Sequence, residues 1–468
     1  MFAKIEVIER HLDREVTCLT RQDDAEWYSF GRCNQIAVCA AVEAAESHIG
    51  SILSFNSVQH IAANHGQSTQ FHIAVGVTSP QTCLVLRGRL RALREAGFRV
   101  SLISGPGELL EQTAQREGVE AFAIPLKRGI APLSDFLALI RLWRLLRRLK
   151  PDIVEFSTPK AGLLGSIAAK LCRVPARVYL LRGLKLETSR AIKRRILLAA
   201  ERMAASCAHV VLCNSPSLRA QALQLGVASA EKLVVLGNGS SNGVDLERFS
   251  PGPSDVRERL NIPRDEYLLG FVGRLTCDKG LPELIEAFGL ILKAEPRVYL
   301  LLVGWFDAAE DALEVEIRRR IASHPRIICT GFVAETAPYY RAMDVMVLPT
   351  WREGFPNAVL EAAATGLPVI TTYSTGSRDA VIPQVTGLLV PPGYPDAICE
   401  AVVTLLRAPD RRRRMGQAAR AWITEHYEGK RVLGLTVKYY MTLMSWAVGC
   451  ESVEDCSNEF ATDLSVSR

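Results

Sequence analysis

The sequence predicts an α/β protein with two successive doubly wound domains, each built on a parallel sheet. Short apolar, β-branched segments alternate with helical segments from Phe71 onward, and a second alternation of this kind follows residue 243. The strand segments lack polar alternation, which is typical of a sheet covered by helices on both faces. A length of 468 residues also exceeds what one hydrophobic core usually organises.

The first alternation supplies the elements of the first domain. Gly97 is expected to end the first helix, because glycine commonly stops a helix just beyond its last turn. The expected strands are residues 72–77, 98–103, 121–124, 153–156, 176–181 and 209–213. The expected helices are residues 84–96, 108–117, 132–149, 161–171, 192–205 and 216–225.

A Gly/Asn/Ser-rich stretch, Gly237-Asn-Gly-Ser-Ser-Asn-Gly243, separates the two alternations and is interpreted as a flexible interdomain linker. In the second domain the expected strands are residues 268–272, 298–303, 327–330, 345–348 and 369–372. The expected helices are residues 281–293, 314–324, 336–343, 357–365 and 396–407. In sheets of this kind, ligands bind beyond the carboxyl ends of the strands.

These patterns divide the chain into five parts. They are an N-terminal extension (1–70), a first domain (71–243), a second domain (244–428), a helix returning to the first domain (429–449) and a tail (450–468). The extension shows weak periodicity and precedes a domain that is complete from Phe71. We therefore predict that it is dispensable for folding and activity.

Composition excludes several classes of protein. The net charge of +6 is mild for this length and does not by itself indicate a nucleic-acid partner. The cysteines form no Cys-x-x-Cys pair and lack histidines at zinc spacing, so no metal site is expected. Charged residues through positions 1–20 exclude a secretory signal, and no window of about 18 uncharged apolar residues predicts a spanning helix. These features predict a cytoplasmic protein.

A short loop in the second domain carries two cations between a strand and a helix. It reads Gly273-Arg-Leu-Thr-Cys-Asp-Lys-Gly280. Gly273 lets the backbone approach a ligand, Arg274 offers a bidentate fork and Lys279 a point charge, which together suit a diphosphate. An ordinary solvated loop with an incidental ion pair is the alternative.

A second motif follows the strand at 345–348. Glu353 precedes a glycine turn, and Glu361 lies further along a helix whose neighbouring residues are apolar nearly all round. A carboxylate buried there needs a partner, and it could accept both hydroxyls of a ribose. The backbone amides of the first helical turn would be free to bind an anion. The residues at this turn are Phe355, Pro356, Asn357 and Ala358; of these, only Pro356 has no backbone N–H.

Glu353 and Glu361, with seven residues between them, are followed by Ala-Ala-Ala-Thr-Gly-Leu-Pro-Val-Ile at 362–370. This segment resembles the retaining glycosyltransferases of family four, whose GT-B fold has two facing Rossmann-like domains. The loop at 273–280, residues 342–349, and Asn242-Gly-Val-Asp245 with Arg248-Phe249 match the same family. Ser157-Thr-Pro-Lys-Ala-Gly-Leu-Leu-Gly165 resembles its subgroup that builds bacterial polysaccharides. The resemblance covers about residues 71–445.

The resemblance implies a role for each of these positions. Arg274, Lys279 and Glu353 would be catalytic: the two cations hold the donor diphosphate and Glu353 contacts the donor sugar. The implied donor-binding residues are Gly273, Phe355, Pro356, Asn357, Ala358 and Glu361. It also implies a UDP-linked donor, a lipid-linked glycan acceptor, retention of configuration, and no cofactor or metal.

Ser157 and Lys160 are the candidates on the acceptor side. Many relatives carry a histidine where this chain has Ser157, so a histidine role at that position is in doubt. A serine hydroxyl can hydrogen-bond a sugar but is not a base near neutral pH. No general base is therefore assigned.

Other functions stay open at this point. A nucleotide-sugar epimerase or a phosphorylase would use the same fold, and a catalytically silent homologue could act as a donor-binding scaffold. A dinucleotide oxidoreductase is disfavoured, because Gly105-Pro-Gly107 lacks the third glycine of a Gly-x-Gly-x-x-Gly fingerprint.

Two basic clusters in the first domain indicate a peripheral membrane contact. Arg141, Arg144 and Arg148 share one helical face, and the second cluster comprises Arg190, Lys193, Arg194 and Arg195. Either cluster could be an ordinary solvated helix face. Together they predict docking on an anionic lipid surface, at the inner face of the plasma membrane.

Overall fold

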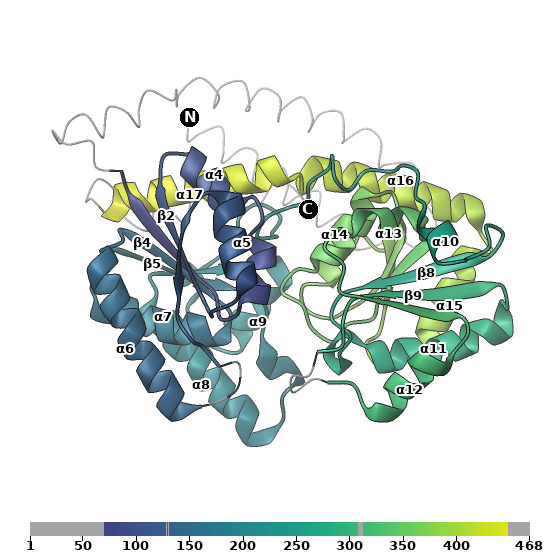
Figure 1. Cartoon of the computed structure of the whole chain (residues 1–468), viewed down its shortest axis with the longest axis horizontal. Coiled ribbons are helices and arrows are strands. Elements are labelled where there is room, and N and C mark those ends of the chain that lie inside the picture. Colours follow the sequence, from purple (N-terminus) through teal and green to yellow (C-terminus); the bar gives the residue numbers. More distant parts are fainter. Residues whose placement is uncertain (1–69, 128, 130, 308–311, 448–468) are drawn as a thin grey trace, which may run out of the picture. The chain divides into compact units, whose positions relative to one another are not determined.

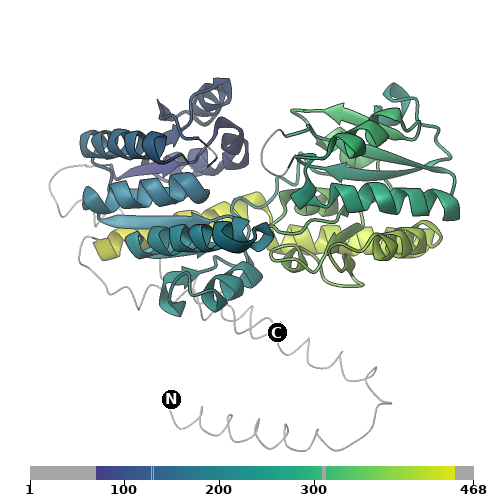
Figure 2. The same cartoon turned by 90° about the horizontal axis from the view of Figure 1, so that it is seen from below.

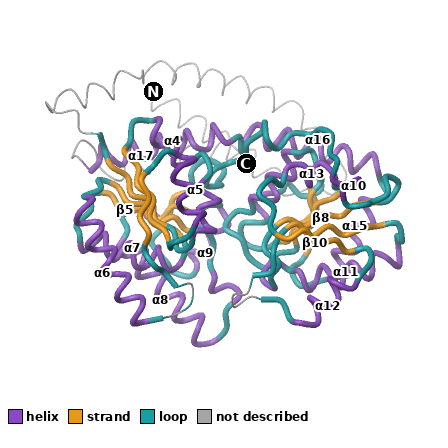
Figure 3. Tube along the Cα trace, viewed as in Figure 1, coloured by secondary structure: helices purple, strands orange, loops and turns teal. Residues whose placement is uncertain are grey.

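The computed structural model describes residues 70–127, 129, 131–307 and 312–447 (Figure 1). The tail expected at 450–468 and the extension expected at 1–70, apart from Gln70, lie outside these residues. Two parallel sheets with helices on their faces make up the described part, which confirms the predicted fold class. Figure 3 shows the strands of the two sheets as separate groups.

The first sheet has the strand order β3-β2-β1-β4-β5-β6-β7, with all pairs parallel. Its strands are β1 (His72–Gly76), β2 (Arg99–Ser104), β3 (Glu120–Ala123), β4 (Ile153–Ser157), β5 (Ala176–Leu181), β6 (Val210–Cys213) and β7 (Leu233–Val234). Its helices are η2 (Pro80–Leu86), α4 (Arg89–Glu95), α5 (Glu108–Glu117), α6 (Pro132–Leu149), α7 (Pro159–Leu171), η3 (Lys185–Thr188), α8 (Ala191–Cys207), α9 (Pro216–Gln224) and η4 (Ala230–Lys232).

The single helix expected at 84–96 is wrong. The chain forms the 3₁₀ turn η2, passes through Gly88 and begins α4 only at Arg89. Gly88 has a φ of 77°, a left-handed conformation that interrupts helical hydrogen bonding.

The second sheet has the order β10-β9-β8-β11-β12-β13, again with all pairs parallel. Its strands are β8 (Tyr267–Val272), β9 (Val298–Val303), β10 (Ile327–Gly331), β11 (Val345–Leu348), β12 (Val369–Thr372) and β13 (Gly387–Val390). Its helices are α10 (Val256–Arg259), η5 (Cys277–Lys279), α11 (Leu281–Ala294), α12 (Val315–Ser323), α13 (Ala337–Ala342), α14 (Asn357–Ala364), η6 (Arg378–Ala380), α15 (Pro395–Leu406), α16 (Pro409–His426) and α17 (Gly429–Ala447).

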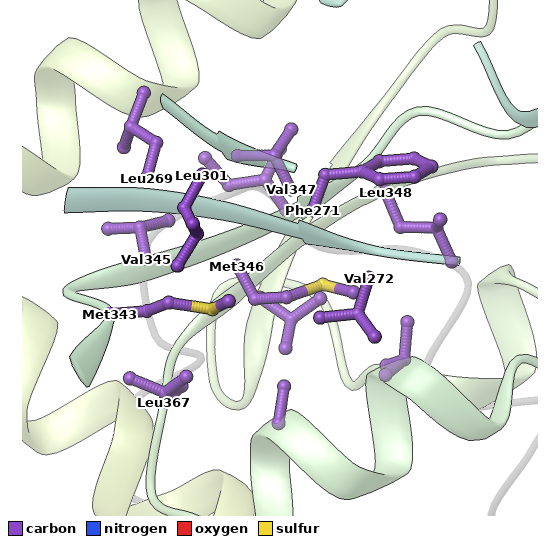
Figure 4. Close-up of a cluster of buried hydrophobic side chains, with 14 of the residues drawn as sticks. Leu269, Phe271, Val272, Leu301, Met343, Val345, Met346, Val347, Leu348 and Leu367 are labelled. Atoms are coloured by element: carbon purple, nitrogen blue, oxygen red, sulfur yellow. The ribbon is translucent and has the colours of Figure 1, made fainter. Parts of the chain in front are cut away.

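The core of the second domain packs most closely around β8 and β11. Phe271, Val347 and Met343 lie among the side chains that meet between these strands and the neighbouring helices (Figure 4). A Cβ added at Gly270 would lie 1.9 Å from the sulfur of Met343, so this strand needs a glycine there. The two strands that carry the candidate site are therefore fixed by close side-chain packing in the core.

The last helix, α17, packs against the first sheet although it follows the second in sequence. Tyr439, Tyr440 and Leu443 share a core cluster with Ile73 and Val75 of β1. In Figure 1 it is the yellow helix that runs on from α16 to the side of α4. The chain thus connects the two domains twice, through residues 237–243 and through α17.

The composition of the glycine-rich segment at 237–243 predicts a flexible linker, but in the structure this segment is hydrogen-bonded to the first domain. Asn214 O accepts the Ser240 N–H at 2.6 Å, and Arg89 Nη1 donates to Ser241 O at 2.7 Å. The side-chain amide of Asn242 donates to Val85 O. Each contact ties the linker to the first domain.

Each sheet has one point where the strand order reverses. It lies between β1 and β4 in the first sheet and between β8 and β11 in the second. Loops leaving neighbouring strands at such a point diverge to opposite faces and leave a crevice, where open α/β sheets bind their ligands. The motifs singled out in the sequence follow these strands: Gly273 after β8, Glu353 after β11 and Ser157 at the end of β4.

Candidate active site

The loop after β8 lies against the loop after β11. Gly280, at the end of the first loop, has a φ of 71°, and a Cβ there would lie 1.9 Å from Pro349 O. Trp351 N–H donates to Asp278 O at 3.0 Å, so the backbones of the two loops are also bonded directly. This close approach brings Lys279 of the first motif to Glu353 of the second.

Both predicted cations are paired with carboxylates. Lys279 Nζ lies 2.5 Å from Glu353 Oε1, and both side chains are only 15% exposed. Arg274 Nη1 donates to Asp307 Oδ2 at 3.1 Å and remains 32% exposed. The structure therefore brings Lys279 and Glu353 together, as two members of one site.

Asp278 connects the remaining charges, and the sequence alone did not indicate it. Its carboxylate, 1% exposed, accepts from Arg352 Nη2 at 2.7 Å and lies 3.6 Å from Arg274 Nη2. Burial opposes ionisation here, but Lys279 and Arg352 outweigh it and hold the pKa of Asp278 below its usual value. Asp278 is therefore an anion that keeps the basic groups of the loop in place.

Helix α14 begins beside these charges. The helix starts at Asn357, as expected, with Pro356 as its N-cap at a φ of −81°, and Phe355 is buried. Asn357 and Ala358 form the first turn, where backbone N–H groups have no partner within the helix. The positive end of the helix dipole adds to the cations of the β8 loop.

Glu361 is half-buried and has a hydrogen-bond partner. Tyr340, on α13, donates its hydroxyl to Glu361 Oε2 at 2.9 Å. Burial raises the pKa of the Glu361 carboxyl to about 7, although the Tyr340 hydroxyl works in the opposite direction. Asn357 and Glu361 line a pocket of about 540 Å³, which Arg248, Arg87 and Asn242 also border.

The acceptor-side candidates occupy the reversal point of the first sheet. Ser157 is fully buried, and its hydroxyl accepts from Arg182 Nε at 3.1 Å. Burial, only partly offset by Glu155, lowers the pKa of Arg182 to about 10. Lys160 forms an ion pair with Asp135 at 2.7 Å, which holds the start of α6 to the start of α7.

Backbone of the first domain lies directly on the donor-side loop. A Cβ at Gly354 would lie 2.2 Å from Arg182 O, and one at Gly183 would lie 3.1 Å from Gly354 N. A side chain larger than glycine at either position would push these two loops apart. The backbone at Glu353 and Gly354 therefore lies directly against the first domain.

Within the described residues, no three or more His, Cys, Asp or Glu side chains gather as a metal site would require. Nor is any described helix both long and apolar enough to cross a membrane. The expectation of catalysis without metal or cofactor stays a prediction, as do the individual roles assigned to the site residues.

Both halves of the chain match known protein families. Residues 266–408 match the family described as glycosyl transferases group 1, and residues 85–239 match a glycosyl transferase 4-like domain. The second match contains all the acceptor-side candidates, and the first contains every donor-side residue.

Curated relatives agree with the family matches. The chain is 33% identical over 380 residues to the capsular polysaccharide biosynthesis glycosyltransferase CapM of Staphylococcus aureus, covering 81% of this chain and 98% of the relative. It is 31% identical over 294 residues to the UDP-Gal:alpha-D-GlcNAc-diphosphoundecaprenol alpha-1,3-galactosyltransferase of Escherichia coli. That second match covers 61% of this chain and 75% of the relative.

Solved structures share the fold. HepE of Anabaena in complex with UDP-glucose superposes with a TM-score of 0.67 at 20% identity, covering 80% of this chain and 100% of that one. Sucrose-phosphate synthase of Thermosynechococcus elongatus gives 0.68 at 23% identity, with the same coverage. A UDP-N-acetylglucosamine 2-epimerase also matches, at 0.57 and 15% identity, so the fold alone does not separate transferase from epimerase. The identity to CapM over nearly its whole length does: this chain belongs to the glycosyl transferase group 1 family and is a glycosyltransferase of the GT-B type.

Proposed function

We propose that the enzyme transfers a sugar, with retention, from a UDP-linked donor to a lipid-linked glycan during capsular or other cell-surface polysaccharide synthesis. The observation that carries the proposal is the cluster of Arg274, Lys279, Glu353 and Glu361 at the reversal point of the second sheet. The names of CapM and of the diphosphoundecaprenol galactosyltransferase support the class of acceptor.

The donor diphosphate would exchange with the carboxylates that now neutralise the cations. Arg274 would turn from Asp307 to the phosphate oxygens, and Lys279 would leave Glu353. Glu353 would then be free to accept hydroxyls of the donor sugar. Charge on the departing nucleoside diphosphate is stabilised by these cations and by the amides of α14, in a site that needs no reorganisation of the backbone.

Glu361 would bind the ribose from within the 540 Å³ pocket. A carboxylate can accept hydrogen bonds from both hydroxyls of a ribose. In Glu361, one carboxylate oxygen already accepts from the Tyr340 hydroxyl. Uridine recognition would follow from residues around this pocket.

Thermal unfolding with a panel of nucleotide sugars tests the donor assignment. One UDP-sugar should raise the melting temperature, since a ligand at about 100 times its Kd adds about 2.7 kcal/mol to stability. Lys279→Ala should show a clearly smaller shift at the same donor concentration, whereas Lys293→Ala, which changes an exposed lysine on α11, should keep the full shift. No shift with any nucleotide sugar, or an equal shift in Lys279→Ala, would contradict the proposal.

A mixed apolar and basic face supports docking of the first domain on membranes. Leu133 and Phe136 on α6 are 77% and 60% exposed, and Ile192 and Ile196 on α8 are 72% and 48% exposed. Helix α7 packs between these two helices, and Figure 2 shows the three as one layer. Arg141, Arg144 and Arg148 continue the exposed face of α6, and Arg190, Arg194 and Arg195 surround Ile192.

Apolar side chains beside exposed cations suit the interface of an anionic bilayer. The starts of α6 and α8 lie at the carboxyl ends of the strands, because each helix follows a strand of the parallel sheet. Docking by this face would present the acceptor side of the active site to a lipid-linked substrate without a spanning helix.

A further inference from the structure

A carboxylate of the first domain reaches the donor-side loop and has no role in the site described above. Glu187 belongs to η3, the 3₁₀ turn that follows β5 through Arg182 and Gly183. It therefore extends from the carboxyl end of a central strand, where sheets of this kind hold their ligands.

Hydrogen bonds connect Glu187 to the backbone of Glu353. Thr375 Oγ1 donates to Glu187 Oε1 at 2.6 Å, and Thr375 O accepts the Glu353 N–H at 3.1 Å. The next residue of η3, Thr188, accepts from Arg352 Nε at 2.9 Å. Two neighbouring residues of the acceptor-side domain thus contact the segment that carries the proposed sugar-binding carboxylate.

The second carboxylate oxygen of Glu187 indicates where a substrate could bind. Glu187 Oε2 is buried and has no hydrogen-bond partner among the described residues. A buried carboxylate oxygen without a donor is costly, and such an atom in a native protein needs an explanation. At this place in the fold, the explanation with chemical content is a hydroxyl supplied by a substrate.

The geometry points to Glu187 as the residue that binds the attacking hydroxyl of the acceptor and removes its proton. This inference rests on the proposed function. The acceptor oxygen approaches the anomeric carbon on the face from which the diphosphate departs, as retention requires. It forms its bond to that carbon while the bond from the carbon to the diphosphate oxygen breaks. The proton of the hydroxyl passes to Glu187 Oε2, and the nucleoside diphosphate leaves with the bonding electron pair.

The surroundings of Glu187 suit a base. Burial raises the pKa of its carboxyl, against the opposing effects of the Thr375 hydroxyl, Arg352 and Arg378. Helix α8, which packs against η3, begins with further cations at Lys193 and at Arg190, its N-cap. A base acts only in its ionised form, so the protonation of Glu187 would control activity.

The test compares Glu187→Gln with two other variants. Gln keeps an oxygen that can accept from Thr375 but cannot take a proton. Glu187→Asp keeps the base on a shorter side chain. Glu201→Gln is the matched control, because Glu201 is also a buried carboxylate of this domain that accepts from a hydroxyl, that of Tyr179 at 2.6 Å.

For Glu187→Gln we expect an unchanged Kd for the donor and a kcat for transfer reduced at least about 100-fold, the usual contribution of a positioned base. The acidic limb of the pH profile of kcat should disappear, Glu187→Asp should recover part of the rate, and Glu201→Gln should behave as wild type. A normal kcat with an unchanged pH profile in Glu187→Gln would overturn the inference. So would a loss of activity that saturating donor restores, since Glu187 would then only hold the donor-binding loop. Wild-type protein without transferase activity would instead refute the proposed function.

Discussion

Glu361 carries a carboxylate in surroundings that disfavour its charge. Its pKa is raised to about 7 by burial, so a large share of the molecules hold it protonated at neutral pH. A protonated carboxyl accepts hydrogen bonds from ribose hydroxyls more weakly than a carboxylate does. Donor binding should therefore be coupled to the ionisation of Glu361.

We predict that affinity for the nucleotide sugar rises as the pH increases through about 7, because the ligand stabilises the ionised form of Glu361. Isothermal titration calorimetry between pH 5.5 and 8.5 measures this directly, since a nucleotide sugar does not itself titrate there. Glu361→Gln should bind weakly with a flat profile. Glu201→Gln should keep the wild-type slope, although burial also raises the pKa of Glu201 to about 7.

Lys279 is assigned a contact of a different kind, between its charge and the phosphates of the donor. Replacing it by Ala should weaken binding of the nucleotide sugar by about 1.5–3 kcal/mol, the usual loss for one charge-assisted contact. The same variant leaves Glu353 without its cation, so transfer should also fall. Equal donor affinity in Lys279→Ala and Lys293→Ala would show that Lys279 does not contact the diphosphate.

The sequence identified the site residues that belong to recognisable motifs and missed those whose role depends on a contact that no motif encodes. Lys279 and Glu353 belong to sequence motifs in which the type and spacing of the residues indicate a ligand-binding role. Tyr340 donates to Glu361 from another helix, and no local pattern indicates that partner. Glu187 was missed because its significance lies in contact with Thr375, far away along the chain.

Helix α17 is attached to the first sheet by a buried ionic cluster. Glu155, fully buried, accepts from both Arg89 and the hydroxyl of Tyr440. Although burial opposes its ionisation, Arg89 lowers the pKa of Glu155 below its usual value. Arg89 also donates to Ser241 O, so the same cluster holds both connections between the domains.

We predict that Glu155→Gln destabilises the protein by about 3–5 kcal/mol, because it leaves the Arg89 charge buried without a carboxylate. Urea unfolding at pH 8 provides the measurement. Glu201→Gln should cost far less at that pH, because Glu201 pairs with the neutral hydroxyl of Tyr179 and Gln avoids ionising a buried acid. Similar losses for the two variants would contradict the role given to the cluster.

Elements with strong apolar periodicity were predicted well, and those without it were missed. Helices α5 and α6 and strands β9 and β11 have the expected bounds. Helix α16 was missed because small residues such as Gly416 and Ala419 form much of its buried face and leave little apolar signal. Strand β7 has only two residues, too few for a recognisable pattern.

At the scale of the molecule, the mixed face of α6 and α8 predicts binding to lipid. Wild-type protein should co-sediment with vesicles containing anionic lipid at low salt and dissociate as salt rises. Arg194→Glu/Arg195→Glu should reduce binding, since each basic residue near the surface contributes about 1 kcal/mol. The matched control is Arg413→Glu/Arg414→Glu on α16 of the second domain, which changes the net charge equally. Equal binding by both variants would exclude α8 from the contact.

In the proposed function, the two reversal points contribute opposite halves of one reaction: the second sheet would hold the donor, and the first would hold the acceptor. Backbone contact between Gly354 and Arg182 joins these halves, and Glu187 lies at their junction. Both halves should therefore be needed for transfer, whereas the second domain should suffice for donor contacts.

Transfer of a labelled sugar from a UDP-linked donor to a diphosphate-linked lipid acceptor is the most direct test of this account. With purified wild-type protein, label should move to the lipid in proportion to enzyme. Lys279→Ala should fail to transfer even when the acceptor is saturating, and Lys293→Ala should match wild type. A wild-type protein that binds the nucleotide sugar but labels no acceptor, or a Lys279→Ala variant as active as wild type, would contradict it.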